Sequence, residues 1–136
     1  MNLATMPTKI TEVDGDASAL VVAAPGRKRN SLRILLRAAP RITIVDLVDD
    51  APSALKSSVD RPPDLLVLDL DPSAHGAWMI LEQVKAEWPQ VRCLVLVDTI
   101  QQGRMAKDAG VDGILVSGFS TNQLLALVEK LLSRRE

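Results

Sequence analysis

One short segment, residues 62–72, constrains the fold more than any other part of the chain. Its sequence is Pro-Pro-Asp-Leu-Leu-Val-Leu-Asp-Leu-Asp-Pro. An apolar run bounded by prolines is typical of a strand covered on both faces, as the central strands of a parallel sheet are. Asp69 lies at the carboxyl end of this strand, where open α/β sheets place their ligands and their chemistry. The rim around Asp69 is therefore the first place to look for a site.

Composition narrows the classes to consider. The chain has 136 residues, which is about one domain, and 47% of them are apolar while only 2% are aromatic. This balance predicts an aliphatic core, which suits a parallel sheet. The formal net charge of −1 argues against nucleic acid as a partner. No apolar run approaches the roughly 18 residues of a membrane span and no signal peptide is visible, so we expect a cytoplasmic protein.

Single cysteine and histidine residues exclude several kinds of site. Cys93 lies inside an apolar run, so we expect a core residue and neither a disulfide nor a thiolate metal site. His75 follows the Asp69 strand in a loop, and its spacing from the nearby acid and glycine does not fit a cobalamin-binding motif. With one histidine and one buried cysteine, no nucleophilic triad can be assembled. The sequence has no glycine-rich phosphate loop, so we predict no enzyme activity and no cofactor.

Hydrophobic periodicity predicts five strands that alternate with five helices. Residues 1–18 lack periodicity and are expected to form a flexible tail, and residues 19–136 are expected to form the domain. The predicted strands cover 19–23, 42–48 at an edge, the Asp69 strand, 91–97 and 114–116. The predicted helices carry Leu32 to Ala39, Leu55 and Val59, Ala77 to Trp88, a segment from Thr99 to about Gly110, and Leu124 to Leu131. Thr99 with Gln102, and Ser120 with Gln123, resemble capping boxes. The alternation predicts parallel pairing with right-handed crossovers.

Three segments resemble the CheY-like receiver domain of two-component response regulators: RPPDLLVLDLDPSAHG, VRCLVLVDT and AGVDGILVSG. They are similar to the third strand with its loop, the fourth strand and the fifth strand of that family, and the resemblance covers about Ala19 to Leu132. It implies a single doubly wound, flavodoxin/CheY-like five-stranded parallel sheet of order 2-1-3-4-5 with helices on both faces. It also implies that Asp69 corresponds to the aspartate that the family phosphorylates.

The positions that support phosphorylation in this family are changed here. Ala23 and Ala24 replace two acidic metal ligands, Val97 (or Asp98, if the register shifts by one) replaces a Ser or Thr, Ser117 replaces a Lys, and Ile114 replaces an aromatic residue. Phosphoryl transfer depends on positioning and charge neutralisation, and Mg²⁺ needs several oxygen ligands. The resemblance is therefore to a degenerate, or pseudo-, receiver.

Two alternatives stay open for the rim. In the first, Asp69, Asp71 and Asp98 rebuild a cation site, and the protein is a phosphorylation-competent receiver that uses Mg²⁺ and accepts phosphoryl groups from a kinase. In the second, the basic run Arg27–Lys28–Arg29 at the start of the first helix binds a small anion, because helix N-termini favour anions. One of these basic side chains could instead pair with Asp69, or all three could be solvated.

The leading hypothesis is a signalling module that works by protein–protein contact without phosphorylation. The resemblance places its output surface on the fourth helix, fifth strand and fifth helix of the family, which span Ile100 to Leu132 here. The last helix has more leucines than one core-facing stripe needs, so we expect Leu125 and Leu132 to be exposed on its flank. We predict that a partner protein or a second copy docks there, with no membrane contact.

Overall fold

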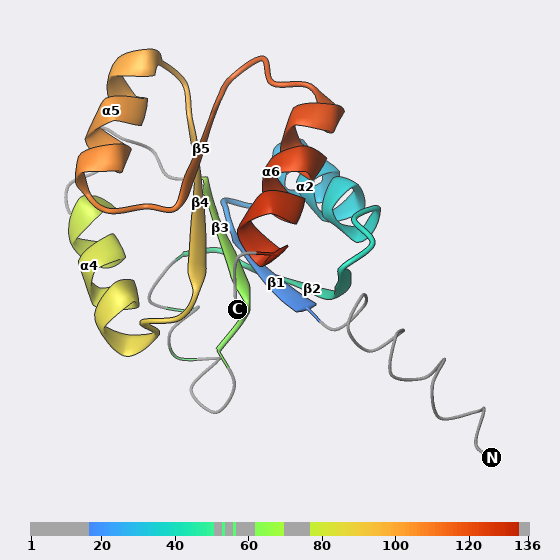
Figure 1. The fold of residues 1–136 in the computed structure, drawn as a ribbon, viewed down its shortest axis with the longest axis horizontal. Coiled ribbons are helices and arrows are strands. Elements are labelled where there is room, and N and C mark those ends of the chain that lie inside the picture. Colours follow the sequence, from blue (N-terminus) through green and yellow to red (C-terminus); the bar gives the residue numbers. More distant parts are fainter. Residues whose placement is uncertain (1–16, 51–52, 54–55, 57–61, 70–76, 134–136) are drawn as a thin grey trace.

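The computed structural model describes residues 17–50, 53, 56, 62–69 and 77–133. Five strands form one parallel sheet: β1 (Ala17–Val22), β2 (Ile42–Val48), β3 (Leu65–Asp69), β4 (Arg92–Val97) and β5 (Gly113–Val116). Their order is β2-β1-β3-β4-β5, which confirms the predicted topology and the edge position of β2. Figure 1 shows the sheet edge-on between two helical layers.

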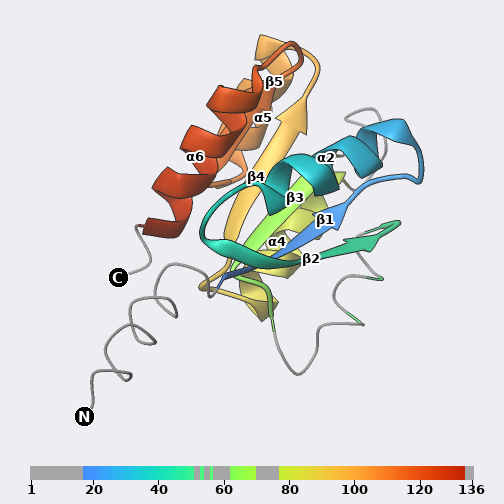
Figure 2. The same ribbon diagram turned by 90° about the vertical axis from the view of Figure 1, so that its right-hand side faces the viewer.

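Each face of the sheet is covered by one pair of described helices. On one face lie α2 (Arg27–Arg37) and α6 (Thr121–Ser133), and on the other lie α4 (Ala77–Glu87) and α5 (Ile100–Asp108) (Figures 1 and 2). Among the described helices, none is both long and apolar enough to cross a bilayer.

Strand residues alternate between two aliphatic core clusters because successive side chains point to opposite faces. In β3, Leu65 and Val67 pack with α2 and α6, while Leu66 and Leu68 pack with α4 and α5. All four side chains are fully buried. The apolar run is therefore a central strand covered on both faces, as its sequence predicts.

The start of the first strand differs from the prediction by two residues. The sequence pattern predicts Ala17 and Ser18 in the tail, but both belong to β1 and pair with β2. The Ser18 N–H donates to Asp64 Oδ2 at 2.8 Å, and the Ala17 N–H donates to the Arg41 carbonyl at 2.9 Å. These bonds come from residues far along the chain, so local periodicity could not reveal them. Residues 1–16 of the predicted tail lie outside the described residues.

The predicted helix starts are confirmed where they are described. Thr99 and Gln102 form a capping box at the start of α5, and Ser120 and Gln123 exchange the same pair of bonds at the start of α6. At the segment after β2, the Ser53 N–H donates to Asp50 Oδ1 at 2.9 Å. Hydrogen bonds from the Ser53 side chain and backbone lower the pKa of Asp50. Leu55 and Val59, predicted for that helix, lie outside the described residues.

Candidate functional site

The carboxyl ends of the parallel strands bring five positions to one rim of the sheet. Ala23 follows β1, Asp49 follows β2, Asp69 ends β3, Asp98 follows β4 and Ser117 follows β5. Parallel pairing aligns these ends, since Val22 pairs with Leu68 and Val97 pairs with Val116. The side chains that reach this rim define what chemistry it can support.

At the centre of the rim, Asp69 pairs with Lys28. Lys28 Nζ lies 3.0 Å from Asp69 Oδ1, and the side chains are 55% and 19% exposed. Lys28 reaches this point because α2 begins directly beyond the turn after β1. The residue that precedes the helix is Gly26, whose φ of 150° favours glycine. The positive charge at the start of α2 therefore faces the Asp69 carboxylate at the end of β3.

The neighbouring basic side chain is also held by the rim. Arg29 Nη1 donates to Asp49 Oδ1 at 2.6 Å and to the Ala23 carbonyl at 3.4 Å. Two of the three side chains in the basic run are thus engaged with protein acceptors. Arg27 is exposed and makes no ion pair with any residue that the structure describes. A small anion at this helix start would compete with Asp69 and Asp49 for its cations.

The end of β4 presents Asp98 to the rim, and not Val97. Val97 is 5% exposed and packs in the core cluster beneath α4 and α5. Asp98 is exposed, and its Oδ1 accepts a hydrogen bond from Ser117 Oγ at 2.9 Å. At this end of the sheet, Asp98 and Ser117 are therefore bonded to each other, and Val97 is part of the core.

The loop between β4 and α5 is held by further hydrogen bonds. Gln102 Oε1 accepts from the Asp98 N–H at 2.8 Å and from the Thr99 N–H at 3.2 Å. The Ser117 N–H donates to the Val97 carbonyl at 2.8 Å. Behind this loop, the partly buried Ile114 packs in the core cluster under α5. Hydrogen bonds within the protein therefore hold the β4–α5 loop and Ser117 in place at the rim.

The described part of the rim does not fit a magnesium ion. Ala23 and Ala24 have no side-chain oxygen, and the accessible carboxylate of Asp69 faces an ammonium group. Within the described ranges, no group of three or more His, Cys, Asp or Glu side chains is arranged to hold a metal. Mg²⁺ requires near-octahedral oxygen coordination. Of the described carboxylates at the rim, Asp69 and Asp49 pair with cations and Asp98 accepts from Ser117. Asp71 and His75, considered above for this region, lie outside the described residues.

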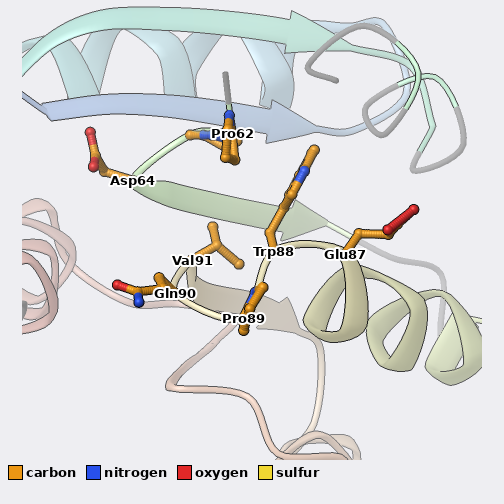
Figure 3. A pocket seen from close by; sticks show the side chains of 8 residues that line it. Pro62, Asp64, Glu87, Trp88, Pro89, Gln90 and Val91 are labelled. Carbon is orange, nitrogen blue, oxygen red and sulfur yellow. The ribbon is translucent and has the colours of Figure 1, made fainter. Parts of the chain in front are cut away.

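A hollow that the sequence did not indicate lies at the opposite end of β3 (Figure 3). It has a volume of about 250 Å³ and is lined by Pro62, Pro63, Asp64, Glu87, Trp88, Pro89, Gln90 and Val91. Its walls come from the two proline-containing turns that precede β3 and β4. One of its two carboxylates, Asp64, already accepts a hydrogen bond from the Ser18 N–H. The hollow offers apolar contact but no arrangement of groups for acid–base or nucleophilic chemistry.

Cys93 is buried in the sheet, as predicted. Burial raises the pKa of its thiol to about 11. A buried, protonated thiol is a poor nucleophile. Cys93 is therefore a core residue and not a reactive one.

The structure resembles known receiver domains closely, although the sequence matches no protein-family model and no curated protein. The chemotaxis response regulator CheY4 of Vibrio cholerae superposes with a TM-score of 0.70 at 21% identity, over 85% of this chain and 98% of that one. A receiver domain protein of Clostridium thermocellum gives 0.73 at 14% identity, over 88% and 96%. A protein attributed to pilus assembly (cpaE) in Burkholderia thailandensis gives 0.74 at 19% identity, over 87% and 99%. The chain therefore has the fold of the CheY-like receiver domains of response regulators.

Proposed function

We propose that this protein is a receiver-like signalling module of a two-component-type pathway that acts by protein–protein contact and without phosphorylation. The observation that supports this most directly is the ion pair between Lys28 and Asp69. An aspartate that accepts a phosphoryl group attacks with a carboxylate oxygen, while a metal ion and further cations neutralise the charge that develops. Here Asp69 Oδ1 pairs with an ammonium group of the same chain, on the side of the rim where Ala23 and Ala24 offer no side-chain ligand to a metal.

The positions around the pair support the same proposal. Ala23 and Ala24 cannot bind a metal through their side chains. Ser117 carries no positive charge, and its hydroxyl donates to Asp98 Oδ1. Asp69, Asp49 and Asp98 therefore each have a partner within the protein, with no phosphoryl group or metal required. We assign no catalytic residue and propose no enzyme activity.

We propose that output runs through the surface formed by α5, β5 and α6. On α5, Ile100 is 69% exposed and Met105 is 46% exposed, and exposed apolar side chains favour a protein contact. The leucines predicted for this role do not provide it. Leu132 is only 4% exposed and lies in the core, and Leu125 is partly buried against the same cluster. The prediction that Leu132 is exposed was wrong, because α6 packs on the sheet and also against α2, and both contacts bury its side chains.

Light scattering tests this surface. If a second copy docks there, the wild-type protein is a dimer at micromolar concentration, and the double variant Ile100→Glu, Met105→Glu is a monomer. If a different protein docks, the wild type is a monomer, and the double variant loses binding to the partner once that partner is known. A wild-type monomer whose partner binds the double variant equally well would remove this surface from the proposal.

Phosphodonor treatment tests the central claim. After incubation with acetyl phosphate and Mg²⁺, the intact mass of the protein should be unchanged, while an ordinary receiver treated in parallel gains a phosphate. A stoichiometric adduct that is absent from Asp69→Asn would overturn the proposal. The phosphorylation-competent alternative, with Asp69 as acceptor and Asp98 nearby, would then hold. A rise in melting temperature with phosphate or nucleotides, lost in Arg27→Ala, would instead favour the anion-binding alternative.

A further inference from the structure

The helix α2 carries an unusual concentration of positive charge. Its sequence, Arg-Lys-Arg-Asn-Ser-Leu-Arg-Ile-Leu-Leu-Arg, has five basic residues and no acidic one. The whole chain has 16 basic and 17 acidic residues, so the rest of the chain carries 11 basic residues against all 17 acidic ones. A protein that is slightly acidic overall therefore carries one strongly basic helix, with 5 of its 16 basic residues.

This arrangement does not stabilise the helix. The first turn, residues 27–29, is basic at the end where the helix dipole is already positive. Arg29, Arg33 and Arg37 follow one another at i, i+4 spacing, where like charges each cost about 0.2–0.5 kcal/mol. The ion pairs of the rim account for Lys28 and Arg29. They do not account for the remaining three arginines.

Those three arginines share the exposed side of α2 with an isoleucine. Arg27, Arg33 and Arg37 are exposed, and none makes an ion pair within the part of the chain that the structure describes. Ile34 is 65% exposed, and it lies directly opposite the buried Leu32 and Leu36 side of the helix at 3.6 residues per turn. We call these four residues the basic face of α2. In Figure 2 the helix lies on the outside of the sheet beside α6.

Within the described residues, Glu129, Asp49 and Asp69 pair with cations outside this face. On α6, the acidic residue Glu129 pairs with Arg41, which follows α2 in the chain. Arg41 Nε donates to Glu129 Oε2 at 2.8 Å. The acidic residues of the strand-end rim, Asp49 and Asp69, are already paired with Arg29 and Lys28. The basic face of α2 therefore presents three cations and one apolar side chain to solvent.

We infer that the basic face of α2 docks an acidic segment of a partner protein, with an apolar side chain of that segment against Ile34. Charge complementarity would speed association and select the partner, and the apolar contact would slow dissociation of the complex. Nucleic acid is a poorer fit, because the rest of this chain has an acidic excess that would repel a phosphate backbone. A membrane surface is also a poorer fit, since binding to it needs a broad apolar face and this face has one apolar residue. The inference concerns α2 alone and holds whichever partner α5, β5 and α6 contact.

Site-specific photo-crosslinking in the protein's own cells tests this inference. Ile34→p-benzoylphenylalanine in the full chain places the reactive group on the basic face, and the matched probe is Ile44→p-benzoylphenylalanine on β2, outside both proposed contact surfaces. The two parent side chains are 65% and 49% exposed. Mass spectrometry of the cross-linked peptide identifies the partner segment. We expect a segment of another protein with net negative charge, cross-linked from position 34 and not from position 44.

Charge reversal in the same cross-linking variant provides the second arm. Arg33→Glu, Arg37→Glu should reduce the product at least about tenfold, because like charges then face each other. Lys56→Glu reverses an exposed positive charge outside both proposed contact surfaces and should leave the product unchanged. Thermal melts of both variants check that the fold is retained. A product that is nucleic acid, lipid, a second copy of this chain or a segment without net negative charge would overturn the inference. So would equal loss in both variants, or no product specific to position 34.

Discussion

Lys28 and Asp69 lie 41 positions apart in the sequence, and their side chains meet at 3.0 Å where α2 and β3 come together. A strand-end carboxylate needs solvent, donors or a cation. In this protein the cation is part of the chain. The Asp69 carboxylate at the end of the central strand is thereby paired with a positive charge of the same chain.

The energy of this pair should be small. Lys28 is more than half exposed, so solvent screening limits the pair to about 0–1 kcal/mol. Lys28→Met and Asp69→Ala should each lower the free energy of unfolding in urea by no more than that, and both should fold. Millimolar Mg²⁺ should leave the melting temperature of the wild type unchanged. If Mg²⁺ stabilised the wild type but not Asp69→Ala, the rim would be a metal site and the pseudo-receiver proposal would fail.

Asp112 should matter more than any single rim residue. Its Oδ2 accepts from the Cys93 N–H at 2.8 Å and from Lys85 Nζ at 3.2 Å, at the amino ends of β4 and β5. Asp112→Ala leaves the buried Cys93 amide without its acceptor, which costs about 1–3 kcal/mol. Asp112→Asn keeps an acceptor oxygen and removes only the ion pair, so its loss should be clearly smaller. Urea denaturation of both variants measures the difference, and equal losses would show that the ion pair dominates.

The stability of the protein should fall in alkaline solution because of Cys93. Burial raises the pKa of this thiol from 9.0 to about 11, so the folded state holds its proton after the unfolded state has lost it. The contribution is complete below about pH 9 and is lost between pH 9 and 11, with a total of about 3 kcal/mol at most. The slope of unfolding free energy against pH in this window should be reduced in Cys93→Ala. An identical slope in the two proteins would contradict the prediction.

Two glycines should respond in opposite directions to alanine. At Gly113 in β5, an added Cβ would lie 3.1 Å from Leu131 Cδ1 and 3.2 Å from Leu127 Cδ2. Gly113→Ala should therefore overpack the contact with α6 and destabilise the protein by about 1–3 kcal/mol. At Gly103 in α5, the nearest atom would be Ile114 Cγ2 at 3.4 Å, an ordinary contact. Gly103→Ala should be neutral or stabilising by up to about 1 kcal/mol, through helix propensity. Thermal melts decide both, and a destabilised Gly103→Ala would show that α5 packs more tightly on β5 than this spacing allows.

Most of the fold could be predicted from the sequence, because strand and helix patterns are local. The apolar run before Asp69, the edge character of 42–48 and the two capping boxes all depend on residues close together in the chain. The same holds for the burial of Cys93 inside an apolar strand. The strand order came from the resemblance to receiver domains, and the structure confirms it.

The contents of the rim were only partly predictable. Local patterns were sufficient to show that Asp69 ends a buried strand, that two alanines follow the first strand, and that three basic residues open the next helix. The pairing of Lys28 with Asp69, and of Arg29 with Asp49, could be seen only in the folded chain. The tertiary structure also placed Asp98 at the rim instead of Val97, and Leu132 in the core instead of on the surface. These outcomes depend on the register of neighbouring strands and on how helices pack across the sheet, and both are set by contacts between residues distant in the chain.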